Sequence, residues 1–355
     1  MGAAGDAIVY RSSPYDEIRV RNLATGSEAI LQNATTTFPS FRNSMTSEWI
    51  YGQYVNKPVS GCVPDCVLRW PITGGQPTPL PRSHTSPGPI EIIAVGTYAV
   101  WINDAGQTTI ALHNATTGIT RDVVVTGTAD TQVLKFDLAV VDGEPVIYYW
   151  AGPPGAVGRP IRTVRLYRWS EARGSEQVEV FEDTNAPGGA QPIFATYISA
   201  DTDHVAYTVW TPATGGSPAS ISTMVRPTRG GATQKVGERS HDPRIRGGVL
   251  MWEENSPAFG GGGSPDSGDI FAWSAARGTE ELQLPDRNVG GGAPAPGFAV
   301  FASRPSSGTS TMLHSWNAAT AEKVKLTEST VIGLYATTGW AYFYGDNLTY
   351  RVKLQ

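Results

Sequence analysis

Residues 268–284 read GDIFAWSAARGTEELQL, and this stretch decides the fold class. A strand-like run ends beside Trp273, a tight turn closes at Gly278, and a second short strand pattern follows it. Alternation with a period of two is typical of a strand that buries one face. A glycine at the end of a short turn supplies the positive φ that a hairpin requires. The stretch therefore predicts a β-hairpin.

The same pattern occurs seven times along the chain, with an average spacing of about 49 residues, which is typical of propeller blades. The seven turns end at Gly26, Gly75, Gly118, Gly174, Gly231, Gly278 and Ala321. Two further strand patterns precede each turn, such as residues 249–252 and 298–301. Each full repeat thus predicts four antiparallel strands, which we name first to fourth, and four such strands make one blade of a β-propeller.

The two ends of the chain carry partial copies of the repeat. The first copy shows no first strand, and the last copy, residues 331–355, shows three strands and no obvious fourth. Eight blades is the direct count, and seven results if the two partial copies do not each build a blade. No long segment has apolar residues at the spacing of a helix. We therefore predict an all-β protein with a single β-propeller domain over residues 1–355.

Residues 268–273, followed by Arg277, Gly278 and residues 281–284, resemble the TolB-like (WD40-like, PD40) β-propeller superfamily. The resemblance covers nearly the whole chain, as a fold-level pattern. Propellers of this superfamily include periplasmic interaction proteins, the propeller domains of serine peptidases and some polysaccharide lyases. No catalytic motif of these proteins can be placed here residue by residue, so the resemblance implies the fold and leaves the function open.

Composition excludes several classes of protein. The formal net charge is −5 and no cluster of Lys and Arg occurs, which argues against nucleic-acid binding. No apolar run is long enough for a membrane span. The first residues have neither a basic stretch nor an apolar core, so we expect no signal peptide in this sequence. We further expect a monomer.

The chain has two cysteines, Cys62 and Cys66, in a loop rich in glycine and proline. Their spacing can close a small disulfide ring, and the alternative is a reduced cytosolic pair. A bridge implies an oxidising compartment, so we predict an extracytoplasmic protein, secreted or periplasmic. Zinc would need further ligands, which are not nearby in the sequence.

The connections between strands differ in length. The turns between third and fourth strands are short and uniform, whereas four connections between second and third strands are long: residues 56–66, 151–163, 211–220 and 254–269. Long loops on a rigid scaffold commonly carry binding. We therefore predict that the end of the blades with the long connections is the functional face.

The loops that lead from each fourth strand to the next blade are expected on the same face, near the mouth of the central channel. They carry the candidate ligand-binding residues, which are His84, Glu182, Arg239, His241, Asp242 and Asp286. A histidine beside a carboxylate can exchange protons or bind a metal. The alternative is that these residues form ion pairs at the rim and cap turns. We assign no metal ligand and expect no cofactor.

The leading functional hypothesis is a non-catalytic propeller that binds a protein, a glycan or a small molecule at the channel mouth. One alternative is a carbohydrate-active enzyme, a polysaccharide lyase or glycoside hydrolase, that uses His84, His241 and nearby carboxylates. The other is a lectin with repeated sugar sites, which predicts equivalent exposed tryptophans in several blades. All ten tryptophans fall within the repeats, and packing between blades is the simpler reading of that periodicity.

Overall fold

The computed structural model describes sixteen stretches of the chain, and every structural statement below concerns them. They are residues 2–12, 17–31, 43–53, 66–81, 91–104, 106–124, 132–152, 163–182, 197–211, 220–238, 240–254, 269–284, 287–305, 312–328, 333–345 and 348–354. Their regular structure is all strand. Within these stretches no helix has the length and apolar character needed to cross a membrane.

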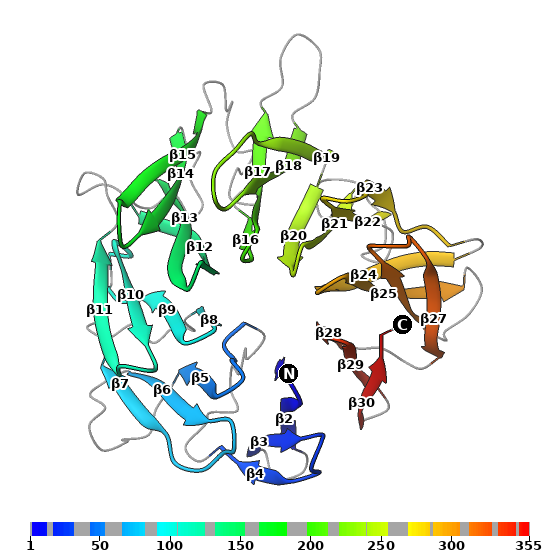
Figure 1. The fold of residues 1–355 in the computed structure, drawn as a ribbon, viewed down its shortest axis with the longest axis horizontal. Coiled ribbons are helices and arrows are strands. Elements are labelled where there is room, and N and C mark those ends of the chain that lie inside the picture. The colour runs from blue at the N-terminus through cyan, green and yellow to red at the C-terminus, as the bar shows by residue number, and fades with distance from the viewer. Residues whose placement is uncertain are drawn as a thin grey trace. The chain divides into compact units, whose positions relative to one another are not determined.

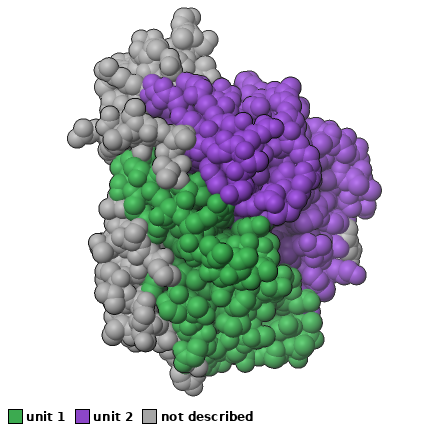
Figure 2. Space-filling view, turned by 60° about the vertical axis from the view of Figure 1, so that its left-hand side comes forward, with its two compact units in different colours: residues 1–133 green, residues 134–355 purple. Residues whose placement is uncertain are grey.

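The chain forms two compact units, unit 1 (residues 1–133) and unit 2 (residues 134–355), shown in Figure 2. Unit 1 holds three antiparallel sheets whose strands follow the chain order (Figure 1). These sheets are β1 (Gly2–Ala4), β2 (Ala7–Ser12), β3 (Glu17–Asn22) and β4 (Glu28–Ile30); β5 (Trp49–Gln53), β6 (Cys66–Pro71) and β7 (Thr78–Pro81); and β8 (Ile92–Val95), β9 (Tyr98–Ile102), β10 (Thr109–Asn114) and β11 (Ile119–Val124).

Five more sheets, again with strands in chain order, make up unit 2, and the division between the units falls within β12. They are β12 (Gln132–Val141), β13 (Glu144–Gly152), β14 (Thr163–Ser170) and β15 (Gly174–Glu182); β16 (Ile198–Ala200), β17 (His204–Thr211), β18 (Ser220–Pro227) and β19 (Gln234–Glu238); β20 (Ser240–Arg246), β21 (Val249–Glu254), β22 (Asp269–Ser274) and β23 (Gly278–Glu281); β24 (Arg287–Ala295), β25 (Phe298–Pro305), β26 (Met312–Asn317) and β27 (Lys323–Glu328); and β28 (Gly333–Thr337), β29 (Trp340–Gly345) and β30 (Leu348–Lys353).

The eight sheets confirm the predicted β-propeller and the count of eight blades. Six sheets have four strands and two have three within the described stretches. The last sheet has the three strands that the sequence predicted. The second sheet has β5 to β7, and residues 32–42 before it lie outside the described residues.

One expectation about the first blade was wrong. The first copy of the repeat is complete, because β1 pairs with β2 through Gly2↔Val9 and Ala4↔Ala7. Glycine and alanine have low strand propensity, so the sequence carries little signal here. Backbone hydrogen bonds do not depend on side-chain type, and burial of Ala3 accompanies the pairing.

The predicted turns all join the third strand of a sheet to the fourth, and their last residues have positive φ. Gly26, Gly118, Gly174 and Gly278 have φ between 64° and 75°. The seventh copy reaches φ 60° with Ala321 in the same place. A side chain in this conformation brings its Cβ close to a carbonyl oxygen, which costs about 1 kcal/mol.

Replacing Ala321 with glycine is therefore expected to stabilise the protein by about 1 kcal/mol, because glycine adopts positive φ without that penalty. The midpoint of urea unfolding should rise with no change in slope. Ala319→Gly in the same turn is the matched control, since Ala319 is exposed and is not among the residues with positive φ. Equal responses of the two variants would contradict the role given to Ala321.

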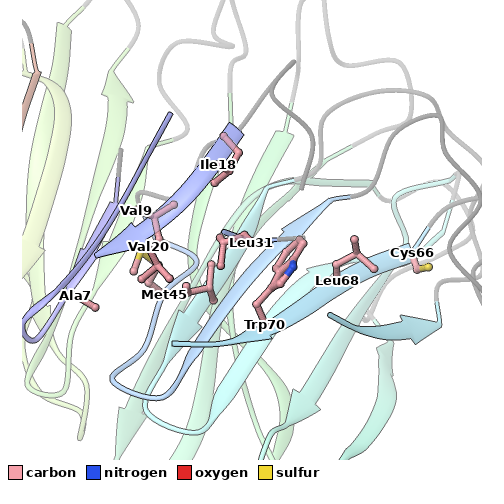
Figure 3. Packing of buried hydrophobic residues seen from close by; sticks show 10 residues of the cluster. Ala7, Val9, Ile18, Val20, Leu31, Met45, Cys66, Leu68 and Trp70 are labelled. Atoms are coloured by element: carbon pink, nitrogen blue, oxygen red, sulfur yellow. The ribbon is translucent and has the colours of Figure 1, made fainter. Parts of the chain in front are cut away.

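Side chains fill the space between consecutive sheets within each unit. In unit 1, Trp70 of β6 packs in one cluster with Leu31 and with Val9 and Val20 of the preceding sheet (Figure 3). In unit 2, Trp316 of β26 packs in the same way against the sheet β20–β23. The bulk of these tryptophans suits the wide gap between two twisted sheets. The repeat of tryptophan along the sequence thus has a packing cause.

Candidate functional site

The structure locates some of the predicted site residues and leaves others outside its described stretches. His84, Arg239 and Asp286 lie outside them. Glu182 ends β15, and His241 and Asp242 lie within β20. The expectation of a loop at His241 and Asp242 was therefore wrong. Pairing of β20 with β21 begins at Ser240↔Glu254, so ladder hydrogen bonds extend into a segment whose polarity suggested a loop.

Asp242 has an unusual backbone conformation. The register between β20 and β21 shifts between His241 and Arg244, which is a β-bulge, and Asp242 has φ 49° inside it. Aspartate tolerates this region better than most residues because its short side chain can bond locally. Its carboxylate forms an ion pair with Arg244, and the two side chains are 34% and 33% exposed. A bulge thus presents a half-exposed charged pair near the start of β20.

Tyr197 and Glu253 complete the group that we call the β20 cluster, together with Asp242 and Arg244. Burial, together with the carboxylates of Asp242 and Glu253, which disfavour a phenolate, raises the pKa of Tyr197 to about 12. The Tyr197 phenol therefore stays protonated at neutral pH and can donate a hydrogen bond. Its backbone is fixed, since its N–H donates to Thr208 Oγ1 at 3.0 Å.

The β20 cluster lies at the end of the sheets from which the long connections leave. Tyr197 precedes β16, Asp242 is near the start of β20, and Glu253 is near the end of β21. The connections after Gly152, Thr211 and Glu254 start from this same end, since each follows a second strand. The first strands of neighbouring sheets also contact one another: β16 with β20, β20 with β24, and β24 with β28.

A carboxylate that the candidate list omitted lies next to this cluster. Glu254 accepts hydrogen bonds from Trp252 Nε1 at 2.8 Å and from the Glu238 N–H at 2.9 Å. Burial raises the pKa of Glu254, although these two donors favour its ionised form. In the sequence, only a weak signal indicated Glu254, which directly follows the strand residues Trp252 and Glu253. Among the described residues, no group of three or more His, Cys, Asp or Glu side chains is arranged to hold a metal ion.

The histidines on strands have structural surroundings. His113 and His314 are buried on the third strands β10 and β26, and His314 Nε2 lies 3.0 Å from Ser303 Oγ. His204 begins β17, and its ring meets the Trp273 ring edge-on at 5.2 Å between centroids. These contacts are structural.

Most tryptophans are also enclosed by protein. Seven are buried, which are Trp70, Trp101, Trp150, Trp169, Trp252, Trp273 and Trp316. The half-buried Trp49 and Trp340 each stack with an arginine, Arg69 and Arg351, at 4.1 Å from guanidinium carbon to ring centroid. A lectin with a repeated tryptophan platform needs exposed rings. The described tryptophans therefore do not form that platform.

The β20 cluster offers one hydroxyl donor, one guanidinium and two carboxylates at a half-exposed edge. This set can bind a polar partner through directed hydrogen bonds. The carboxylate of Asp242, which pairs with Arg244, can accept hydrogen bonds from a partner. The chemistry of the cluster is therefore recognition.

Comparisons with known proteins bear on the fold. No family model matches the chain, and no curated protein matches it in sequence. A crystal structure of a eukaryotic initiation factor is similar, with a TM-score of 0.55 and 11% identity over 99% of this chain and 84% of that one. The Dos1 propeller has a TM-score of 0.53 and 8% identity over 97% of this chain and 88% of its own.

The β-propeller domain of the trilobed protease from Pyrococcus furiosus covers 99% of this chain and 92% of its own, with a TM-score of 0.49 and 10% identity. Identities this low show a shared fold and nothing about shared activity. The predicted β-propeller fold is thus confirmed. The chain is an eight-bladed β-propeller.

Proposed function

We propose that this chain is a non-catalytic binding propeller that acts outside the cytoplasm and recognises its partner at the end with the long connections. The backbone of Asp242 is the observation that carries this proposal. A non-glycine residue at positive φ costs free energy and persists only where its surroundings impose it. Such positions cluster at binding and active sites. Here the conformation presents a carboxylate beside Arg244, close to Tyr197.

A polar partner suits this site best. Asp242 accepts hydrogen bonds, while Arg244 and the Tyr197 hydroxyl donate them. Glycans and polar peptide segments both offer the complementary groups, so a glycan array with and without calcium and manganese is the first assay. We expect binding to one glycan class and no released product.

Asp242→Asn tests the site itself. Asparagine also tolerates positive φ, so we expect the thermal midpoint to change by less than about 2 °C while binding on the array is lost. Asp242→Gly is the second variant, because it relieves the backbone cost and removes the carboxylate. It should raise stability by about 1 kcal/mol and also abolish binding. Retention of binding by both variants would exclude the β20 cluster as the site.

A carbohydrate-active enzyme is the second candidate. One observation favours it: His241 is the cross-strand partner of Glu253, next to Glu254, whose pKa burial raises. Burial of a carboxyl group is one way in which a protein prepares a general acid. Release of product from the bound glycan, lost in Glu254→Gln with binding retained, would establish this candidate in place of the first.

We also propose that Cys62 and Cys66 form the disulfide expected of an extracytoplasmic protein. Cys66 begins β6 and is buried, and Cys62 lies outside the described residues. A bridge across so short a loop would anchor one long connection to its strand. Mass spectrometry after alkylation of the unfolded chain should show modification only when a reductant is added, and modification without one would refute the bridge.

A further inference from the structure

One position of the repeat fills the space between consecutive sheets in each unit. It lies on the third strand just before the turn, and it holds a large ring in five of the blades: Trp70, His113, Trp169, Trp273 and Trp316. The first blade has the exposed Arg21 there. Trp273 packs against His204 and Trp316 packs among residues of the preceding sheet. His113 likewise reaches Tyr51 of its preceding sheet, at 6.1 Å between ring centroids. A large ring at this position closes the gap.

The sheet β16–β19 has Arg226 at this position instead. Its neighbour Val225 packs toward the following sheet with Ile245 and Trp252. Side chains alternate along a strand, so Arg226 is directed toward the preceding sheet, β12–β15. A cleft of about 700 Å³ lies there, lined by both sheets and including Tyr148, Arg168 and Arg226. The exchange of a bulky ring for an arginine thus coincides with a cavity.

The other arginines of this cleft already have carboxylate partners. Arg229 pairs with Asp142 at 2.8 Å and with Asp203 at 3.1 Å. Arg168 and Arg173 share Glu176, each at 3.6 Å between nitrogen and oxygen. Arg226 makes no hydrogen bond or ion pair with any residue that the structure describes. It is half-buried, so its charge is partly removed from water without a fixed counter-charge.

Two further polar groups lie in the cleft, the Nε of Arg168 and the hydroxyl of Tyr148. The buried Nε of Arg168 has no hydrogen-bond partner in the described part of the chain. The buried Tyr148 lies directly across the strand pair from Arg168. Burial raises the pKa of Tyr148, while Arg168 and Arg226 both oppose that shift. Both guanidinium groups therefore lie close to the tyrosine hydroxyl.

We infer that this cleft binds a small ligand carrying a single carboxylate, which would pair with Arg226 beside Arg168 and the Tyr148 hydroxyl. A planar guanidinium matches a carboxylate in two parallel hydrogen bonds. The apolar surfaces of Val141, Val178 and Pro227 in the lining would contact the remainder of the ligand. One negative charge balances the one arginine without a carboxylate partner. A doubly charged phosphate would place excess charge near Glu176 and Asp142. This site is separate from the β20 cluster, since it lies at the turn end of the sheets.

Titration of the intact protein with sodium benzoate, followed by calorimetry, tests the inference. Benzamide is the uncharged analogue, and inorganic phosphate is the competing anion. We expect benzoate to bind and benzamide and phosphate not to bind. Arg226→Met should weaken benzoate binding by at least about tenfold, because a hydrogen-bonded charge is removed. The control Arg277→Met removes an exposed turn arginine and should leave binding unchanged.

Arg226→Trp gives an independent check, because it introduces the residue that fills this position in other blades. It should close the cleft, abolish benzoate binding and leave the far-ultraviolet circular dichroism spectrum unchanged. Arg226→Gln serves if the tryptophan variant fails to fold. Benzoate binding that survives both Arg226→Met and Arg226→Gln would overturn the proposed site. Binding of phosphate in preference to benzoate would overturn the carboxylate assignment.

Discussion

Replacing Trp316 with alanine is expected to lower the free energy of unfolding by about 3–5 kcal/mol. Trp316 is fully buried and packs between two sheets with Val249, Met251 and Phe301. Deleting the indole removes its transfer free energy and leaves a cavity that rigid neighbouring sheets close only in part. Urea unfolding followed by circular dichroism measures the change, which should appear as a lower midpoint with an unchanged slope.

Trp316→Phe separates loss of volume from loss of a hydrogen bond. The indole Nε1 of Trp316 has no hydrogen-bond partner among the residues that the structure describes. The change to phenylalanine therefore reduces the side-chain volume and removes no hydrogen bond to those residues. We expect a loss of about 1–2 kcal/mol. A phenylalanine variant as unstable as the alanine variant would show that the indole N–H, and not its bulk, stabilises this sheet pair.

Acidification from pH 6.5 to pH 4 is expected to cost the protein about 3 kcal/mol through His113 alone. Arg69 Nη1 donates to His113 Nε2 at 3.1 Å, so Nε2 is the acceptor and the ring proton is on Nδ1, facing Thr120 Oγ1 at 2.9 Å. Burial, assisted by the charge of Arg69, lowers the pKa of His113 to about 4. The buried ring is therefore neutral at physiological pH.

The sign of this effect follows from proton binding. Below pH 6.5 the unfolded chain takes up a proton on this histidine, and the folded chain does not until about pH 4. Stability that is present above pH 6.5 is thus lost as the pH falls through this window. His113→Gln keeps a neutral acceptor and donor, and it should flatten the fall in stability between pH 6.5 and pH 4. Parallel pH profiles for the two proteins would contradict the assignment.

The two proposed sites lie at opposite ends of the blades in unit 2, and they share only the sheet β16–β19. The β20 cluster lies where the long connections leave, and the Arg226 cleft lies among the short turns, next to Asp142 and Arg229. The variants Asp242→Asn and Arg226→Met can therefore be compared directly, since each leaves the other site intact. Loss of array binding in one and of benzoate binding in the other would show that the sites are independent.

Part of the position of Asp242 could be predicted from the sequence. It was expected at the end of the blades with the long connections, and it lies at that end, within a strand and not in a loop. Its left-handed backbone was not predicted, because a β-bulge depends on pairing with a partner strand. The sequence shows Arg226 where several other repeats have tryptophan, but the cleft beside it was not predicted. Whether a smaller or charged residue opens a cleft depends on the neighbouring sheet.

By itself, the sequence determined the all-β class, the eight repeats and the positions of the turns, including the one that ends at Ala321. These features are local, since strand alternation and turn geometry are set by neighbours in the chain. Only the tertiary structure decided the pairing of β1, the low pKa of His113, the strain at Asp242 and the cleft at Arg226. Each of these arises from groups distant in sequence, and burial and charge act through space, not along the chain.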